Sequence, residues 1–229
     1  MNIVQEAALI AGKDLKIEMR ARVITQQILP FGLIVLLLFA FALDPDRGVL
    51  RRVAPGLFWV TVLLAALLGI SRAFSIEAEH GAHDGLRLSG LDGSSIFLGK
   101  AAALALELLA LEVVLGIGIV VLYDSPTRAA GLLLLVATAL AATWGLAVVG
   151  TLYGGLAAGA RVRDTLLPLL LLPVAAPVLI GANRATEAAL GIGDRAVTEG
   201  WPWVGLLTVF SLAYTALGLV AFGPLLEEP

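Results

Sequence analysis

The sequence predicts an all-α integral membrane protein, with six transmembrane helices preceded by an amphipathic interfacial helix. Of its 229 residues, 59% are hydrophobic and only 14% are charged, whereas about 25% of the residues in an average soluble domain are charged. Charged side chains are also absent from several long stretches, namely residues 23–43, 53–71, 129–160, 165–183 and 200–226. Because about 20 apolar residues suffice for a helix to cross the hydrocarbon core, these stretches predict transmembrane helices.

Residues 2–22 predict the interfacial helix. Apolar residues recur with a period close to that of an α-helix, at Ile3, Val4, Ala7, Ala8, Ala11, Leu15 and Met19. The charged residues of the second half flank this stripe, which is typical of a helix lying at the membrane surface. A plain solvated helix is the alternative. The charges also leave no apolar core of the signal-peptide type.

Six spans are predicted near residues 24–43, 54–71, 96–122, 130–153, 165–182 and 202–223, within a single transmembrane domain covering 1–229. All six are expected to be helices, because backbone hydrogen bonds must be satisfied internally in lipid. Pro30 lies in the first turns of the first span, and Pro55 is expected to open the second. A polar loop at 72–95 separates the second span from the third.

The distribution of Lys and Arg predicts that both termini face the cytoplasm. With the N-terminus inside, the inner set is Lys13, Lys16, Arg20, Arg22, Arg72, Arg87, Lys100, Arg161 and Arg163. The smaller outer set is Arg47, Arg51, Arg52, Arg128, Arg184 and Arg195. Trp201 and Trp203 then lie at the outer interface, where amphipathic rings are favoured.

Glu107 and Glu112 are the acidic residues of the third span. An ionisable residue inside a span is costly and usually faces the bundle interior or a polar cavity. Five residues of an α-helix correspond to a rotation of about 140°, so the two carboxyl groups are not expected to share a face. Two interpretations stay open: a permeation, proton-relay or gating role, and a structural role as a hydrogen bond to a neighbouring helix or as a protonated acid.

Small residues and prolines mark the fourth and fifth spans. Glycines spaced four apart allow helices to approach closely, and they occur at the end of the fourth span as Gly150, Gly154, Gly155 and Gly159. The fifth span contains Pro168, Pro173 and Pro177. Each proline removes a backbone hydrogen bond, so this helix is expected to be kinked or interrupted.

Several classes of function are excluded or disfavoured. No segment has the pattern G-x-x-x-x-G-K-[ST], so no P-loop is present, and the low net charge gives no basic surface for nucleic acid. Without cysteine there is no thiolate nucleophile or zinc–thiolate site. The Glu77-x-x-His80 pair lies in the polar loop, where we expect a solvated, partner-facing segment and no metal site.

Two stretches carry a resemblance to a known family. Residues 72–100, the loop with the start of the third span, and residues 150–180, rich in Leu and Pro, resemble the cytochrome c maturation B protein family. Lys13-Asp14-Leu15 and Ala54-Pro55-Gly56-Leu57 also fit. The resemblance covers nearly the whole chain. Two departures lie in the loop, where Gly90 replaces a usual proline and His83 a usual leucine, and these affect the shape of the loop.

The resemblance implies a non-catalytic permease subunit of a haem-exporter-type ABC transporter, with the type-2 exporter fold, in the bacterial inner membrane. Its implied partners are an ATPase that alone binds ATP, a haem-handling membrane subunit, a small accessory subunit and a second permease copy. No covalent cofactor is expected, whereas haem is a possible transported or handled ligand. Glu112 would be the family's third-span carboxylate.

The loop between spans two and three would then dock on the ATPase. The resemblance places Glu77, Glu79, Gly85, Leu86 and Ser89 on this coupling surface. The local pattern of acidic and apolar residues adds Phe74, Asp84 and Leu88, and Arg87 lies within the same segment. An apolar patch bordered by acids suits a groove on a partner.

Other functions remain open from the residues alone. An ABC-2-type permease for a lipid, a drug or a polymer would have the same architecture. A proton-coupled carrier using Glu107 or Glu112 is disfavoured, because no inverted repeat is evident. A membrane-embedded enzyme is the least favoured, because no nucleophile–base set lies at membrane depth.

Overall fold

A computed structural model of the chain describes residues 2–22, 24–43, 47–79, 92–123, 129–158 and 163–227. Every regular element in these residues is helical. In chain order they are α1 (Ile3–Ala21), η1 (Ile24–Ile28), α2 (Leu29–Ala42), α3 (Arg47–Glu79), α5 (Gly93–Tyr123), η2 (Ala129–Gly131), α6 (Leu132–Ala158), α7 (Arg163–Leu190), η3 (Ile192–Asp194), η4 (Val197–Gly200) and α8 (Trp201–Glu227). The predicted all-α membrane fold is confirmed.

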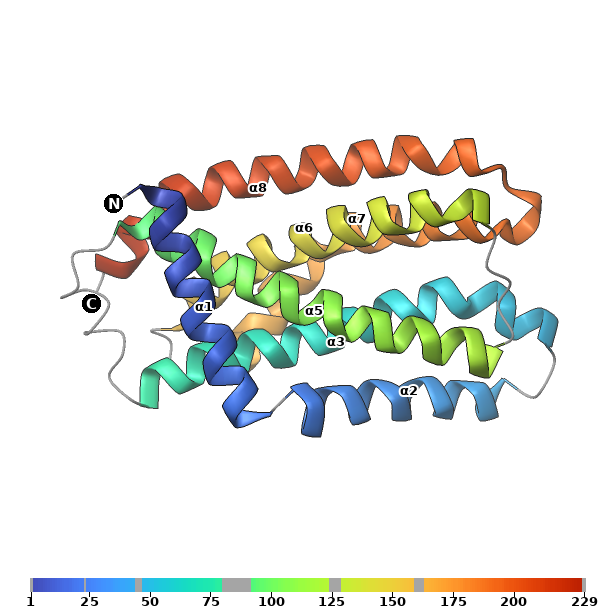
Figure 1. Cartoon of the computed structure of the whole chain (residues 1–229), viewed down its shortest axis with the longest axis horizontal. Helices are drawn as coiled ribbons and strands as arrows, with labels where there is room; N and C mark the ends of the chain where they lie inside the picture. Colours follow the sequence, from blue (N-terminus) through green and yellow to red (C-terminus); the bar gives the residue numbers. More distant parts are fainter. Residues whose placement is uncertain are drawn as a thin grey trace.

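The long helices form an elongated bundle with α5 at its centre (Figure 1). Helix α5 packs against α1, α2, α3, α6 and α8, and α7 packs against α3, α6 and α8. Helix α1 crosses α5 obliquely near one end of the bundle, and α1 begins at the same end at which α8 finishes (Figure 1). A chain whose two ends lie at the same end of the bundle crosses the membrane an even number of times, and the described arrangement agrees with this.

Within the described residues, five helical segments are long and apolar enough to cross a membrane unaided: Gly48–Phe74, Gly93–Leu122, Ala129–Ala157, Thr165–Leu190 and Val197–Leu225. The remaining predicted span corresponds to η1 and α2. Helix α2 has 14 residues, which extend about 21 Å, so it is shorter than a hydrocarbon core of about 30 Å. It becomes a sixth candidate only as part of a bent pair with α1, Ile3–Ala21 and Gln26–Ala42, which meet at 53°.

Helix α3 is longer than the second span predicted from the sequence. It begins at Arg47, so Pro55 lies inside it and does not open it. It also continues to Glu79, into the segment predicted to be loop. The reason is that the buried stripe Ala66, Ile70 and Phe74 continues at intervals of four residues past the last predicted turn, and such a stripe keeps one helix face packed.

Helix α1 docks on α5 by close contact of the two backbones. At Gly99 of α5, an added Cβ atom would lie 2.6 Å from Cβ of Ile10 and 2.8 Å from the carbonyl oxygen of Ala7. Only a residue without a side chain fits at this crossing. The start of α5 is capped by Asp92, whose carboxylate accepts hydrogen bonds from the hydroxyl and the backbone N–H of Ser94, and these bonds lower the pKa of Asp92.

Candidate functional site

Glu112 lies on the face of α5 that packs against α6, and its side chain is only 5% exposed. Its Oε1 atom accepts a hydrogen bond from the hydroxyl of Thr143 on α6. Its Oε2 atom is buried and has no hydrogen-bond partner within the described part of the chain. One oxygen therefore fixes the side chain between two helices, and the other is available to a further group.

Thr143 differs from three other threonines of the bundle in where its hydroxyl points. Thr138, Thr208 and Thr215 each donate to the carbonyl four residues earlier in their own helix, which is the local bond that Thr commonly makes in helices. Thr143 donates to Glu112, which lies 31 residues away in the sequence. Glu112 is thus the partner that draws this hydroxyl across the helix interface.

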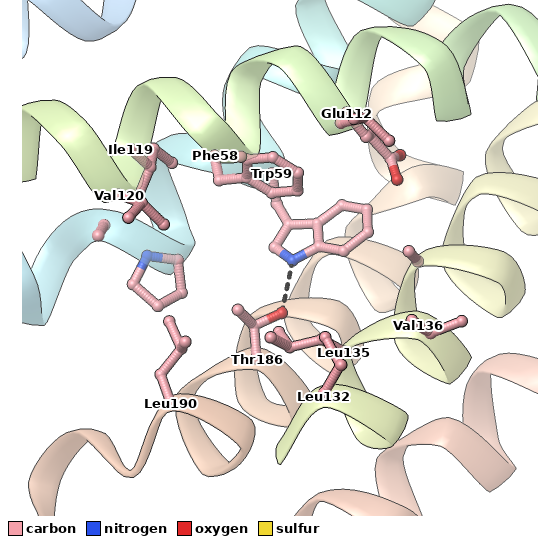
Figure 2. A pocket seen from close by; sticks show the side chains of 15 residues that line it. Phe58, Trp59, Glu112, Ile119, Val120, Leu132, Leu135, Val136, Thr186 and Leu190 are labelled. Atoms are coloured by element: carbon pink, nitrogen blue, oxygen red, sulfur yellow. Dashed lines mark hydrogen bonds between the residues drawn. The ribbon is translucent and has the colours of Figure 1, made fainter. Parts of the chain in front are cut away.

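A pocket of about 350 Å³ lies beside Glu112, between α3, α5, α6 and α7 (Figure 2). Its walls are almost entirely apolar, and Figure 2 shows side chains such as Phe58, Ile119, Leu135 and Leu190 around it. Other lining residues, including Val113, Leu132 and Val136, are exposed on the surface of the bundle. The pocket therefore borders the face of α5 and α6 that would contact lipid.

Trp59 and Thr186 form a polar contact at the wall of this pocket. The indole Nε1–H of Trp59, on α3, donates to Oγ1 of Thr186, on α7, over 2.9 Å (Figure 2). The Thr186 hydroxyl in turn donates to the carbonyl oxygen of Ala182 at 2.7 Å. Because both polar groups have hydrogen-bond partners inside the protein, neither of them needs a water molecule in the pocket as a partner.

Glu107 occupies a different face of α5. It is half-buried, and it lies within electrostatic range of Asp14 and Glu18 on α1. Glu112 contacts α6, so the two carboxyl groups do not form one site. Glu107 belongs to the interface between α5 and α1, and of the two carboxyl groups only that of Glu112 lines the pocket.

Lys100 is buried, which its charge did not predict. It lies in α5, as the predicted span 96–122 requires, but its side chain is only 7% exposed. Its ammonium group lies 3.8 Å from a carboxylate oxygen of Asp14 on α1 and 5.1 Å from the centre of the Phe74 ring on α3. A buried charge needs such partners. Lys100 therefore joins α1, α3 and α5 at one end of the bundle.

Comparison with known proteins identifies the family. A family model described as CcmB protein matches residues 5–227. Heme exporter protein B of Haemophilus influenzae is 33% identical over 217 residues, which are 90% of this chain and 94% of that protein. Heme exporter protein B of Paracoccus denitrificans is 31% identical, over 92% of each chain. That of Pseudomonas aeruginosa is 32% identical, over 84% of this chain and 85% of its own.

The chain belongs to the CcmB protein family. The resemblance noted in the sequence is thereby confirmed, and it extends over nearly the whole chain. The described residues of this CcmB-family chain contain no group of three His, Asp or Glu side chains placed to hold a metal ion. The Glu77-x-x-His80 pair is only partly within the described residues, since His80 lies outside them.

The predicted coupling residues of this CcmB-family chain fall into three groups. Phe74 is only 5% exposed and packs inward, so it is not an exposed anchor for a partner. The physical reason is the position of its ring beneath the ammonium group of Lys100 and against Gly154. Glu77 and Glu79 belong to the last turns of α3. The rest of the set lies outside the described residues, namely Asp84, Gly85, Leu86, Arg87, Leu88 and Ser89.

The glycines of α6 lie at contacts within the chain. An added Cβ at Gly150 would lie 2.3 Å from the Ile70 side chain, and at Gly154 it would lie 2.4 Å from the Phe74 ring, both on α3. Gly155 faces the ring of Phe222 on α8. Gly159 lies outside the described residues. In the CcmB-family fold these small residues let α6 approach α3 on one side and α8 on the other.

Pro168, Pro173 and Pro177 all lie inside α7, which runs as one helix from Arg163 to Leu190. The described helix is therefore not interrupted at these prolines, and the predicted kink stays a prediction. Pro173 and Pro177 are exposed on the bundle surface, so their rings do not pack in the core.

Proposed function

We propose that this chain is the non-catalytic permease subunit of an ATP-driven haem exporter that serves cytochrome c maturation in the bacterial inner membrane. The observation that carries the proposal is the match to proteins named Heme exporter protein B over about nine-tenths of both chains. The absence of a P-loop in the sequence supports a separate ATPase. Haem is on this proposal a substrate or a handled ligand, and no covalent cofactor is involved.

The proposed complex contains two permease copies and two ATPase chains, with a haem-handling membrane subunit and a small accessory subunit. The ATPase docks on the loop that follows α3. Movement of this loop would pull on the end of α3. There Phe74 of α3 contacts Lys100 of α5, and Lys100 in turn pairs with Asp14 of α1. Since α5 also carries Glu112, this three-helix junction offers a mechanical route from the ATPase to the pocket.

Co-purification tests the proposal. The full chain, extracted in a mild detergent with its native partners, is expected to bring down an ABC ATPase, and Leu86→Asp is expected to reduce this recovery by about ten-fold. The reason is that a buried apolar anchor contributes much of the energy of such docking, whereas an aspartate cannot enter an apolar groove. Mass spectrometry measures the recovery, and Leu86→Met is the matched control.

Two outcomes would contradict the proposal. Full ATPase recovery and full cytochrome c maturation with Leu86→Asp would remove the loop from the coupling surface. Substrate transport by the purified chain in the absence of any ATPase would favour the proton-coupled carrier, for which Glu107 and Glu112 are the candidate intramembrane carboxyl groups.

The proposed orientation places both termini in the cytoplasm, on the basis of nine inner against six outer Lys and Arg residues out of 15. A reporter enzyme that is active only in the periplasm, fused after Glu228, is expected to be inactive. The same reporter inserted in the loop near Arg128 is expected to be active. A periplasmic signal from the C-terminal fusion would contradict the orientation.

A further inference from the structure

A second, basic pocket lies next to the apolar one. It has a volume of about 220 Å³, and it is lined by Arg51, Arg52 and Gly48 at the start of α3 and by Gly191 and Gly193 after α7. Leu190 lines both pockets. The end of α7 therefore forms part of the wall of both pockets.

The two pockets also share one side of α3. Arg51 in the basic pocket and Pro55 in the apolar pocket are four residues apart, so they lie on the same face of the helix. Glu112, on α5, lies 11 residues before Tyr123 at the end of that helix, which corresponds to about 16 Å along its axis. The two pockets therefore lie next to each other along α3, the basic one nearer the end of the bundle and the apolar one beside Glu112.

This arrangement has the chemistry of a site for an amphiphile. Two guanidinium groups lie at the end of the bundle, where they can bind a carboxylate or a phosphate by charge-assisted hydrogen bonds. The adjoining apolar walls can bury a ring or chain. Within the apolar half, the buried Oε2 atom of Glu112 lacks a partner among the described residues, so it can accept a hydrogen bond from, or as the acid donate one to, a polar group of the ligand.

We propose that the two pockets form a single binding site for an amphiphilic anion, with the anionic head on Arg51 and Arg52 and the apolar body beside Glu112. A haem, with a flat apolar ring and two carboxylates on one edge, and an anionic phospholipid both have this chemistry. The choice of haem as a probe rests on the proposed function. The site itself rests on the shape and charge of the pockets.

Gly116 makes the apolar half of the site testable. It lines the pocket, and an added Cβ atom there would meet no other atom within 4 Å. Gly116→Leu is therefore expected to fill the pocket without disturbing helix packing. Gly205, on α8, is equally unobstructed but lines none of the pockets described, so Gly205→Leu is the matched control.

The anionic half is tested by the double variant Arg51→Gln/Arg52→Gln. Its matched control is Arg184→Gln/Arg195→Gln, which removes the same charge from the same end of the bundle but from residues that line neither pocket. The side chains of Arg51 and Arg52 lie outside the packed core. The variant Arg51→Gln/Arg52→Gln is therefore expected to fold, and it tests the proposal even if Gly116→Leu does not fold.

Binding is measured on the purified full chain in nanodiscs. In the first arm, ferric haem is titrated into phosphatidylcholine nanodiscs, and its absorbance and the quenching of tryptophan fluorescence, to which Trp59 in the pocket wall contributes, report binding. In the second arm, native mass spectrometry counts phosphatidylglycerol molecules retained from a mixture with phosphatidylcholine. Arg51→Gln/Arg52→Gln is expected to weaken binding of the retained ligand about ten-fold or more, the scale of losing a charged hydrogen bond. Gly116→Leu is also expected to weaken it, because its side chain occupies the apolar half of the site. Both controls are expected to match the unaltered chain.

Loss of haem binding in both test variants would support the site with haem as its occupant. Loss of phosphatidylglycerol retention alone would support the site with a lipid as its occupant. The proposal is overturned if the unaltered chain binds neither ligand more tightly than the test variants do. Since no ATPase takes part in this measurement, its result is independent of the co-purification that tests the proposed function.

Discussion

Replacing Glu112 with leucine is expected to reduce cytochrome c maturation by about ten-fold or more while the membrane complex still assembles. The side chain has two oxygens with different roles, since Oε1 accepts from Thr143 and Oε2 faces no partner among the described residues. Leucine removes both, but it fills similar space in an apolar wall, so folding is expected to survive. An interaction that involves a charged group contributes roughly 1.5–3 kcal/mol, which corresponds to about ten-fold or more.

Glu112→Gln separates the two possible roles of this residue. Glutamine keeps an acceptor for the Thr143 hydroxyl, but it cannot ionise or exchange a proton. We expect Glu112→Gln to lose about as much activity as Glu112→Leu, because a charged side chain at the centre of a span costs about 2.5–3.5 kcal/mol on insertion scales. A residue needed only to accept a hydrogen bond from Thr143 could be a glutamine, with a lower free energy of membrane insertion.

The measurement compares the two Glu112 variants in one strain, with the amount of assembled complex determined alongside cytochrome c levels. Thr143→Ser is the matched control, since it retains the hydroxyl that reaches Oε1, and it is expected to remain close to normal. Normal activity in Glu112→Gln together with a loss in Glu112→Leu would reduce Glu112 to a structural hydrogen bond. Normal activity in both would remove the residue from the mechanism.

Gly99→Leu is expected to detach α1 from the bundle. The added side chain would collide with Cβ of Ile10 and the carbonyl oxygen of Ala7, at 2.6 and 2.8 Å even for its first atom. The backbone oxygen cannot move aside without shifting the whole helix. The destabilisation is expected to reach the upper end of the overpacking range, about 3 kcal/mol, with a fall in Tm of about 6–12 °C.

Limited proteolysis measures this detachment directly. Trypsin cleaves after Lys13, Lys16 and Arg20, which lie on α1, and these sites are expected to become more rapidly cleaved in Gly99→Leu than in the unaltered chain. Gly12→Leu is the matched control, because Gly12 is also on α1 but an added Cβ there meets nothing within 4 Å. Equal cleavage and an unchanged Tm in Gly99→Leu would contradict the described crossing of α1 and α5.

The sequence predicted the helices well because the membrane imposes a simple rule on each segment separately. A long uncharged stretch has few alternatives to a transmembrane helix, and even the third span was identified despite Glu107 and Glu112. The ends of helices were less predictable. Helix α3 extends to Glu79 because Phe74 packs inward, and this packing depends on α5 and α6, which follow it in the chain.

The candidate site was predictable only in part. Glu112 was identifiable as a carboxylate at membrane depth, but its partner Thr143 is 31 residues away, and nothing in the local sequence separates that threonine from Thr138. The burial of Lys100 could likewise not be predicted from the sequence, because it depends on Asp14 in another helix. The apolar pocket is built from four helices, and only their tertiary arrangement brings its walls together.

Because α1 begins and α8 finishes at the same end of the bundle (Figure 1), two copies of this chain can be joined in tandem by a linker that never has to cross the bilayer. Such a single-chain dimer would fix the stoichiometry at two and make its halves genetically distinguishable. A substitution could then be introduced into one half alone. The fused polypeptide would reveal whether one intact pocket sustains a full transport cycle or whether both halves must act together.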